Sequence, residues 1–259
     1  MRMMKKVLGT VTVLALSASL LAGCGSTAAS PVSSAASTAA ESTTSSVVSE
    51  TTSAAADENV AAAAQLLNDL TGSYQELWPV ILADEYQQTW LDDCTALVGE
   101  ENAEVAFEKL SSMVTSDVYG EDAVEAYANG GGAYFCGFTN SLATLTFDGE
   151  TSTISGTDKD GNVLFSHTYH YIGMEPVRGL YEFQSDDADS GEFTYFFLAP
   201  DTSAETYHIE FRYGSDAEAL SQYDTGEYAY WLASGISTDC DQTMIDNCIE
   251  LFCTENLAG

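Results

Sequence analysis

The sequence predicts an α+β fold in which helices precede and follow an antiparallel, barrel-like sheet. Apolar residues recur with the 3.6-residue period of a helix up to about position 127, and the period changes to two from position 133 onward. At least seven short segments with this alternation follow, and a last helical pattern covers 238–257. This order of elements is typical of an α+β domain whose sheet closes on itself.

The helical pattern before the sheet falls into two stretches, 59–98 and 101–127. Pro79 must interrupt or kink the first stretch, because proline lacks the amide proton of a helical hydrogen bond. Tyr74 and Trp78 are four residues apart and would share one face of this helix. We therefore expect both side chains to be buried against one end of the barrel.

The expected strands are short and are separated by turn signals. Asp148-Gly149 and Asp160-Gly161 are dipeptides that favour tight hairpins between antiparallel strands. The segments with period-two alternation are 133–139, 142–147, 151–156, 163–172, 179–184, 192–198 and 206–213. Their number and spacing indicate a sheet built mainly from neighbouring strands.

The N-terminus has the pattern of a secretory signal. Basic residues lie within 1–6, and an apolar run at 7–22 is too short for an ordinary membrane-spanning helix. The sequence LLAGC at 20–24 resembles the lipobox of bacterial lipoproteins. This resemblance implies that residues 1–23 are removed and that Cys24 carries the lipid (palmitate) that anchors the protein at the extracytoplasmic face of the cell membrane. The alternative is an ordinary secreted protein in which Cys24 has no such role.

The segment 24–56 consists mostly of Ser, Thr and Ala after the cysteine. It has too few apolar residues to form a core, so we expect a flexible tether between the membrane and the folded part. The residues 57–259 that follow are sufficient for one domain.

The chain is strongly acidic, with 40 Asp and Glu against 7 Lys and Arg and a formal net charge of −33. Such a surface repels phosphate backbones, so the composition excludes nucleic acid as a partner. The sequence also lacks the motifs of serine hydrolases, zinc proteases and phosphate-binding loops. It therefore predicts a binding protein and not an enzyme.

Five cysteines remain besides Cys24. Because the number is odd, at least one is expected to be a free thiol, and the absence of a C-x-x-C motif argues against thioredoxin-like chemistry or a zinc ribbon. Cys248 belongs to the apolar face of the last helix, which favours a core position over a ligand role. The five are Cys94, Cys136, Cys240, Cys248 and Cys253.

Two segments resemble the ZinT family of extracytoplasmic zinc-binding proteins, which also occur fused to zinc-uptake receptors. They are LTGSYQELWP at 70–79 and TYHIEFRYGSD at 206–216, and the similarity extends over about 70–232. The resemblance implies a calycin-like, lipocalin-related β-barrel with helices at its N-terminal end. It also implies Zn²⁺ as the ligand and a zinc-importer component as a partner.

The resemblance further implies a zinc site of three histidines, in which a His-x-His pair on a late strand joins one histidine from the strand before it. His208 corresponds to the second member of the pair. Thr206 stands at the position of the first member, and Phe196 stands at the position of the upstream histidine. The histidine site is therefore expected to be incomplete.

The residues around His208 suggest how a metal site with fewer histidines would be built. Side chains at i and i+2 of a strand point to the same face, so Thr206, His208, Glu210 and Arg212 would share one face. If that face looks into the barrel, His208 and Glu210 would supply one nitrogen and one oxygen ligand, and Arg212 would compete with the metal for Glu210. The alternative is a polar His208–Glu210–Arg212 network without metal.

His167 and His170 are the two other histidines and the remaining candidate ligands. Residues at i and i+3 of a strand point to opposite faces, so both cannot join one metal without a bulge. One of them would approach His208 from a neighbouring strand. The alternative is that both are half-buried strand residues next to Tyr169 and Tyr171.

Two functions remain open at this point. The first is a membrane-anchored, extracytoplasmic divalent-metal binding protein, with zinc as the first candidate, that acts as a scavenger or as an accessory to zinc uptake. The second is a metal-free calycin-like barrel that binds a small ligand or a partner protein. The family resemblance and the acidic surface favour the first, whereas Thr206 and Phe196 favour the second.

Overall fold

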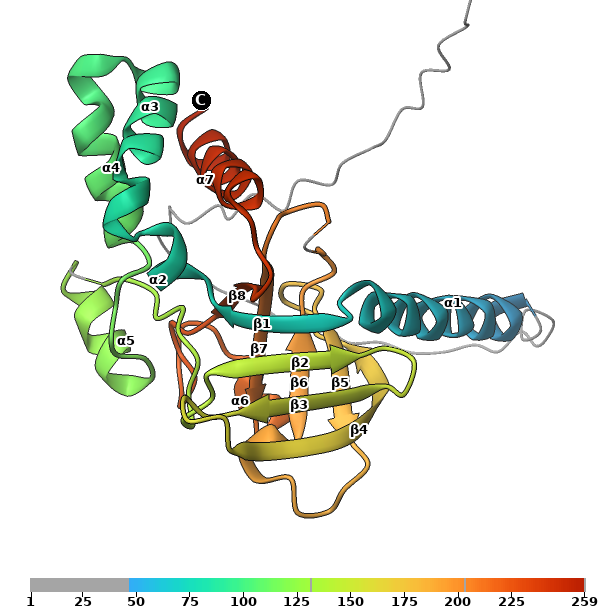
Figure 1. The fold of residues 1–259 in the computed structure, drawn as a ribbon. Helices are drawn as coiled ribbons and strands as arrows, with labels where there is room; N and C mark the ends of the chain where they lie inside the picture. Colours follow the sequence, from blue (N-terminus) through green and yellow to red (C-terminus); the bar gives the residue numbers. More distant parts are fainter. Residues whose placement is uncertain (1–46, 131, 203, 259) are drawn as a thin grey trace, which may run out of the picture. The chain divides into compact units, whose positions relative to one another are not determined.

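The computed structural model describes residues 47–130, 132–202 and 204–258. In this part of the chain, eight antiparallel strands close into a barrel in which each strand pairs with its neighbours in sequence (Figure 1). Pairing of β8 with β1 closes the barrel, so the sheet has no free edge. The predicted α+β architecture, with a calycin-like barrel, N-terminal helices and a C-terminal helix, is thereby confirmed.

The strands are β1 (Gly72–Glu76), β2 (Thr144–Asp148), β3 (Thr153–Thr157), β4 (Val163–Met174), β5 (Tyr181–Ser185), β6 (Tyr195–Leu198), β7 (Ile209–Gly214) and β8 (Ala233–Ser237). The helices are α1 (Val47–Asp69), α2 (Leu77–Ile81), α3 (Gln87–Val98), α4 (Ala103–Ser112), α5 (Glu121–Ala128), α6 (Ala217–Leu220) and α7 (Gln242–Leu257).

Aromatic side chains fill the interior of the barrel. Ile209, Phe211 and Tyr213 alternate along β7 and all belong to the buried core. Phe196 on β6 lies opposite Tyr213 in the strand register, and the two rings stack with centroids 5.3 Å apart. The interior is therefore a packed core of large rings.

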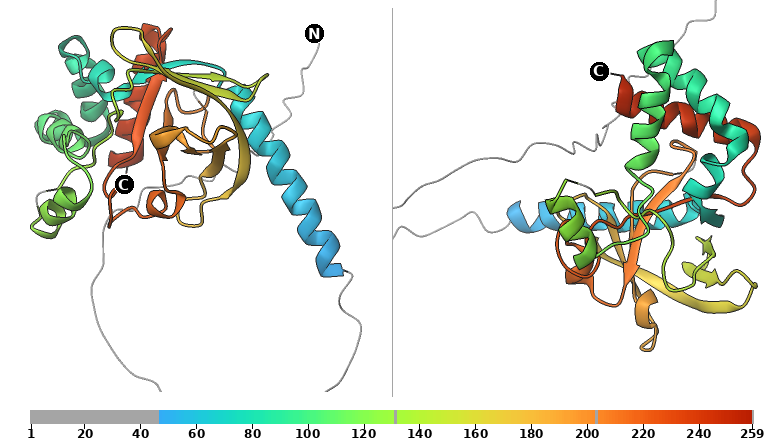
Figure 2. Two further views of the ribbon diagram at one scale, coloured as in Figure 1. Left: turned by 90° about the horizontal axis from the view of Figure 1, so that it is seen from below. Right: turned by 90° about the vertical axis from the view of Figure 1, so that its left-hand side faces the viewer.

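A layer of helices covers one side of the barrel. Figures 1 and 2 show α3, α4 and α7 packed together on that side, with α2 leading into them from β1. Trp90, Ile245 and Ile249 are buried in this second core. Cys94 on α3 and Cys253 on α7 face each other with their Sγ atoms 3.8 Å apart.

The prediction of a continuous helix over 59–98 is wrong in its central part. Residues Gly72–Glu76 form β1, because they pair with β2 on one side and with β8 on the other and so complete the barrel. Tyr74 and Trp78 are both buried, as predicted, but Tyr74 lies in β1 and Trp78 lies in α2.

Other boundaries also differ from the sequence pattern. The helix expected over 101–127 is two helices, α4 and α5, and the strand expected over 133–139 is reduced to isolated bridges at Phe135. The sequence pattern did not identify β8, which contains Ala233, Gly235 and two serines. These residues have low strand preference, and their pairing with β1 and β7 decides their conformation.

Both predicted hairpins are present. Asp148-Gly149 begins the turn between β2 and β3, and Asp160-Gly161 lies in the turn between β3 and β4. In the second turn, Asp158 Oδ1 accepts hydrogen bonds from the backbone amides of Asp160 and Asn162 at 2.9 and 2.8 Å. Gly161 has a φ of +81°, which explains why glycine follows aspartate there.

The predicted signal peptide (1–23), Cys24 and most of the tether lie outside the described residues. Helix α1 begins at Val47, so the last part of the Ser/Thr/Ala-rich segment is helical. Among the helices of the described part, none combines the length and the apolar character needed to cross a membrane.

Candidate metal-binding site around His208

His208 lies directly before β7 and beneath α7, with only 8% of its surface exposed. Because Ile209, Phe211 and Tyr213 point into the barrel, the alternate residues Glu210 and Arg212 point out of it. The condition for a ligand pair inside the barrel, that this polar face looks inward, is therefore not met. The large apolar side chains occupy the interior, and the polar ones face the helices and loops outside.

A tight turn, not a strand, precedes β7. Tyr207 has a φ of +65°, so Thr206 and His208 do not form the i, i+2 pair of a regular strand. The two residues are instead tied to each other. The Thr206 hydroxyl donates to the His208 carbonyl oxygen at 3.0 Å, and His208 Nδ1 lies 2.7 Å from the Thr206 carbonyl oxygen.

This turn defines the protonation of the His208 ring. A carbonyl oxygen can only accept a hydrogen bond, so Nδ1 must carry the proton that it donates to Thr206. The lone pair is then on Nε2. A backbone carbonyl that orients a ring in this way is a common partner of metal-binding histidines.

Helix α7 covers the other side of the imidazole. The Phe252 ring lies 5.0 Å from the His208 ring, measured between centroids, and Cys248 Sγ lies 4.0 Å from Nδ1. Glu255 is one turn further along the same helix and interacts electrostatically with His208. Residues 248, 252 and 255 therefore form one helix face over the histidine.

The carboxylate of Glu255 on α7 is influenced electrostatically by Glu210 of β7 and by Asp201 of the loop after β6. Partial burial raises the pKa of Glu255, the charges of Glu210 and Asp201 raise it further, and His208 lowers it. Imidazole nitrogen and carboxylate oxygen are both ligand types that divalent cations accept. However, within 58–258, where side chains are described, no three His, Cys, Asp or Glu side chains are close enough to hold one ion, so the residues present do not form a closed zinc centre.

Arg212 is not part of this site. Its guanidinium donates to the carbonyl oxygens of Leu220, Gln222 and Tyr228 and lies over the Tyr223 ring, 4.4 Å from its centroid. The expected competition between Arg212 and a metal for Glu210 is therefore wrong. The alternative His208–Glu210–Arg212 network is also not formed, because the arginine donates its hydrogen bonds to backbone carbonyls of residues 220–228.

Phe196 is equally remote from His208. It is fully buried inside the barrel, whereas His208 is outside. The expectation that positions 196, 206 and 208 surround one point is therefore wrong. The register pairs Leu198 with Phe211, and continuing this ladder brings Asp201 to the level of His208.

His167 and His170 lie on opposite faces of β4, as their spacing predicts. His167 packs beside the Phe165 ring, 5.9 Å away, and its Nδ1 lies 2.6 Å from Asp187 Oδ2. His170 Nδ1 lies 2.6 Å from Asp186 Oδ1. Both histidines thus hold the loop after β5, and Figures 1 and 2 show β4 on a different side of the barrel from α7. Their role as metal ligands stays a prediction.

Sequence reasoning did not identify Asp201, Cys248 or Glu255 as neighbours of His208. The spacing of Cys248, Phe252 and Glu255 on α7 placed them on one helix face. Nothing in the sequence showed which strand that face covers. Asp201 could be found only from the register between β6 and β7.

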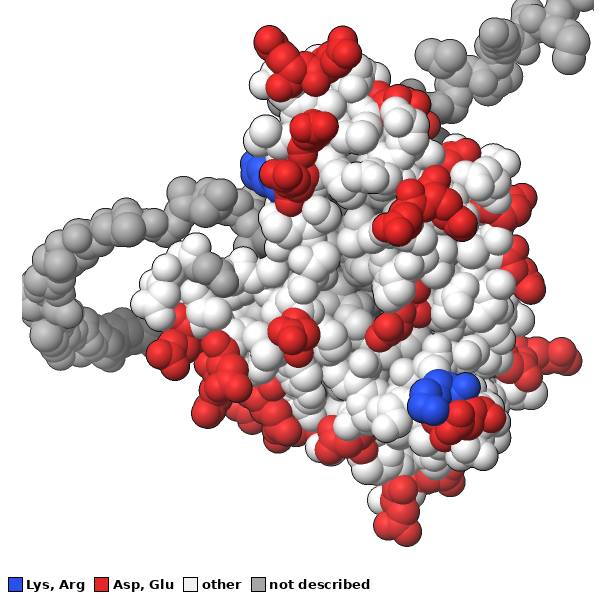
Figure 3. Space-filling view, turned by 60° about the vertical axis from the view of Figure 1, so that its left-hand side comes forward, with Lys and Arg blue, Asp and Glu red and all other residues white. Residues whose placement is uncertain are grey.

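Acidic side chains are also widely distributed over the surface. Figure 3 shows them over most of one face, with very few Lys or Arg side chains between them. Two of the four basic residues after position 6, Arg178 and Arg212, lie against the ring of Tyr223. The charge near His208 is thus part of a generally negative surface.

The chain matches no family model and no curated protein. Among solved structures, it is similar to the Zn(II)-bound ZinT-like domain of Streptococcus pneumoniae AdcA, with 15% identity and a TM-score of 0.45, over 71% of this chain and 89% of that domain. It is also similar to Zn(II)-bound AdcA from Streptococcus pneumoniae, with 14% identity and a TM-score of 0.42, over 70% of this chain and 34% of that protein. This chain therefore spans about a third of AdcA.

Proposed function

We propose that this protein is a membrane-anchored, extracytoplasmic binder of divalent cations, with Zn²⁺ as the first candidate. In this proposal it acts as a scavenger or as an accessory to zinc uptake and has no catalytic activity. The observation that carries it is the orientation of His208, whose Nδ1 proton is held by the Thr206 carbonyl 2.7 Å away. Nε2 is left to bind a cation, and Glu255, which interacts electrostatically with His208, is the nearest source of a carboxylate that this interaction identifies.

The ligand set predicts weak binding. A tight zinc site has three or four protein ligands, usually with several nitrogen or sulfur atoms. One imidazole and a shell of carboxylates favour lower affinity and lower selectivity among divalent cations. We therefore expect a zinc affinity orders of magnitude below that of a three-histidine relative.

Calorimetric titration with Zn²⁺ tests the site. Wild type, His208→Ala and a matched control, His170→Ala, are titrated in excess Mg²⁺, which occupies the general negative surface without competing strongly for imidazole. The proposal expects His208→Ala to lose the zinc-specific heat and His170→Ala to retain it. Equal binding by all three proteins, or loss in His170→Ala alone, would place the site elsewhere.

The membrane anchor has a separate test. If Cys24 carries the lipid, Cys24→Ser should move the protein from the membrane fraction to the soluble fraction of the cell that makes it. Metabolic labelling with a fatty acid should disappear at the same time. A Cys24→Ser variant that stays labelled and membrane-bound would contradict the lipoprotein proposal.

The alternative function is a metal-free barrel that binds a small ligand or a partner protein, and a ligand site inside the barrel has little support. Aromatic side chains such as Phe183, Phe196 and Phe211 are fully buried in the interior. A ligand there would have to displace these packed rings, which is costly. A ligand site is better sought outside the barrel.

A further inference from the structure

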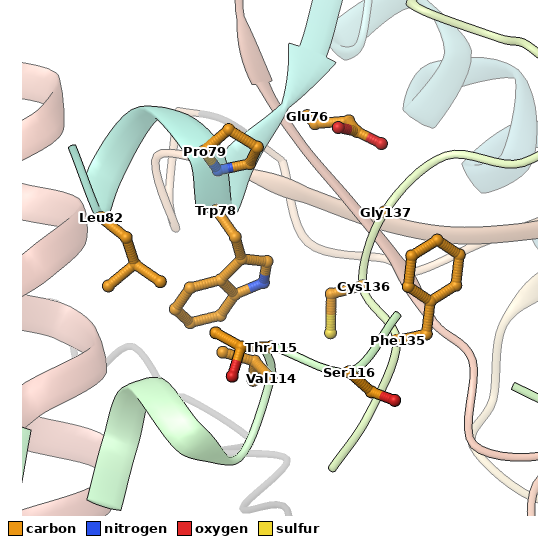
Figure 4. Close-up of a pocket in the computed structure, with 10 residues that line it drawn as sticks. All are labelled: Glu76, Trp78, Pro79, Leu82, Val114, Thr115, Ser116, Phe135, Cys136 and Gly137. Atoms are coloured by element: carbon orange, nitrogen blue, oxygen red, sulfur yellow. The ribbon is translucent and has the colours of Figure 1, made fainter. Parts of the chain in front are cut away.

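A cavity of about 310 Å³ lies outside the barrel, where α2 meets the segment between α4 and α5 and the segment between α5 and β2. Figure 4 shows its lining residues, which come from the end of β1 and α2, from the segment after α4 and from the segment before β2. They are Glu76, Trp78, Pro79, Leu82, Val114, Thr115, Ser116, Phe135, Cys136 and Gly137. The ring of Phe252 contacts both Trp78 and His208, and Glu210 acts electrostatically on Cys136 in the cavity lining, so this cavity is a neighbour of the proposed cation site and has a different set of lining residues.

Trp78 brings an unpaired hydrogen-bond donor to this cavity. The residue is 8% exposed, and its Nε1 is buried without a hydrogen-bond partner. The other two tryptophans are paired, since Trp90 Nε1 donates to the Ile81 carbonyl at 2.7 Å and Trp231 Nε1 donates to the Gly137 carbonyl at 2.9 Å. A buried donor without an acceptor is costly, so it points to an acceptor that a ligand supplies.

The indole nitrogen is directed into the cavity. In Figure 4 it points toward Cys136 and the backbone at Gly137. The Cys136 thiol is the side chain that interacts with the indole, an interaction that lowers the thiol pKa, but burial has the larger effect and raises this pKa to about 12, so the thiol stays protonated. A thiol is only a weak acceptor, and it does not replace a carbonyl oxygen as a partner for the indole N–H.

Glu76 is the one charged side chain in the lining. Its Oε1 accepts a hydrogen bond from the Phe138 backbone amide at 2.6 Å, which fixes the carboxylate and leaves Oε2 for another donor. Gly137 allows this arrangement, because a Cβ there would lie 2.9 Å from Glu76 Oε1 and 2.8 Å from the Phe135 ring. The cavity thus combines a fixed carboxylate, a free indole donor and apolar walls.

We propose that this cavity binds a small cationic amine that also carries a carbonyl group and a short apolar chain, such as an amino-acid amide. The carbonyl oxygen accepts from Trp78 Nε1, and the ammonium group donates to Glu76 Oε2. The apolar chain packs against Pro79, Leu82 and Val114. The volume is at the lower end of the range for small-molecule sites, which matches a ligand of this size.

The charge of the protein restricts the ligand to cations and neutral molecules. Glu76 lies in the cavity, and the whole chain carries a net charge of −33, so an anion would be repelled. An amine gains a charge-assisted hydrogen bond at the same place. This inference does not depend on metal binding at His208.

The indole N–H resonances of the ¹⁵N-labelled full chain test the proposal directly. Leucinamide is titrated at about pH 6.5, below the ordinary pKa of an α-amino group, with 4-methylpentanamide as the matched probe that lacks the amine. We expect leucinamide to shift the Trp78 resonance downfield, while the hydrogen-bonded Trp90 and Trp231 resonances stay in place. Binding of 4-methylpentanamide should be weaker by about tenfold, because it loses one charge-assisted hydrogen bond.

Glu76→Gln supplies the control, because glutamine can still accept the Phe138 amide through its carbonyl oxygen. In this variant leucinamide and 4-methylpentanamide should bind with equal affinity. If leucinamide at about 20 mM, a concentration that detects millimolar affinity, leaves the Trp78 resonance unchanged, the cavity is not a site for this class. Equal binding of both amides by the wild type would overturn the role of Glu76, and equal shifts of all three indoles would show nonspecific association.

Discussion

At the scale of single residues, Arg212 shows how a charge can serve structure in a chain with few basic residues. It is fully buried, and its donors are distributed over the carbonyl oxygens of Leu220, Gln222 and Tyr228. The Tyr223 ring lies between the Arg212 and Arg178 guanidinium groups, 4.4 and 4.3 Å from its centroid. The arginine thus holds the segment between α6 and β8 against the outside of β7.

Replacing Arg212 should therefore destabilise the fold. We expect Arg212→Lys to lower the free energy of unfolding by about 3–5 kcal/mol, because one ammonium group cannot reach three carbonyls in different directions. Urea denaturation measures the loss. Lys159→Ala, at an exposed residue that forms a surface ion pair with Asp160, is the control and should change the stability by no more than about 0.5 kcal/mol. An Arg212→Lys variant as stable as the control would contradict this role.

The burial of the cysteine thiols leads to a second prediction at the scale of single residues. The five cysteines of the described part are free thiols, and burial raises the pKa of Cys136 and of Cys248 to about 12. At pH about 8 their thiolate fraction is then on the order of one in ten thousand. We expect iodoacetamide to modify both at least about 100-fold more slowly in the native protein than in denaturant.

Cys240 is the internal comparison, because it is only half-buried and should react first among the five. Peptide mass spectrometry after timed alkylation gives each rate separately. Native reaction of Cys136 or Cys248 at the rate of the denatured chain would show that these thiols are accessible.

At the scale of elements, α1 closes one end of the barrel by a close backbone contact. Leu66, Leu67 and Leu70 belong to the barrel core. The turn after β2 lies directly against the helix, where a Cβ on Gly149 would be 2.4 Å from the Asn68 Cα. Gly149 does not have a positive φ, so the close approach of α1, and not turn conformation, requires glycine there.

Gly149→Ala should therefore separate α1 from the barrel. We expect a loss of about 1–3 kcal/mol in the free energy of unfolding, the usual cost of overpacking against rigid backbone. Gly173→Ala is the matched control, since its Cβ would meet nothing closer than a side-chain oxygen at 3.6 Å. Thermal melts that place both variants at the same midpoint would contradict the close packing of α1.

At the scale of the whole molecule, negative charge sets how stability changes with pH. Burial raises the pKa of Asp93, Glu182 and Glu255, and nearby carboxylates raise each of them further. A carboxyl whose pKa is higher in the folded than in the unfolded state binds more protons when folded. The free energy of unfolding therefore falls as the pH rises above the unfolded values of about 4.

The protein should accordingly be more stable in mild acid than at neutral pH. We expect the thermal midpoint to rise as the pH is lowered from about 7.5 to about 5, because these carboxyls take up protons and the repulsion among the charges decreases. Added NaCl at neutral pH should also raise the midpoint by screening. A midpoint that falls over this pH range, or that does not respond to salt, would contradict the argument.

The sequence by itself determined the features that depend on neighbouring residues. The period-two pattern and the two Asp-Gly turns predicted β2, β3 and β4, and the helical period predicted α7. The opposite orientation of His167 and His170 also followed from their spacing. In each case a local pattern of side chains and backbone hydrogen bonds is sufficient.

The tertiary structure decided what depends on contacts between distant segments. Gly72–Glu76 has helical spacing, yet it is a strand because closure of the barrel gives it partners on both sides. Apolar and polar residues alternate along β7 in the sequence. Only the packing of its aromatic residues in the core beside β6 shows that His208 lies outside the barrel. The electrostatic interaction of Glu255 with His208 and Asp201 also depends on contacts between distant segments, and so does the absence of a hydrogen-bond partner for Trp78 Nε1. The local periodicity of apolar residues defines which side chains share a face of a strand or helix. Which segment packs against that face is decided only by the tertiary fold.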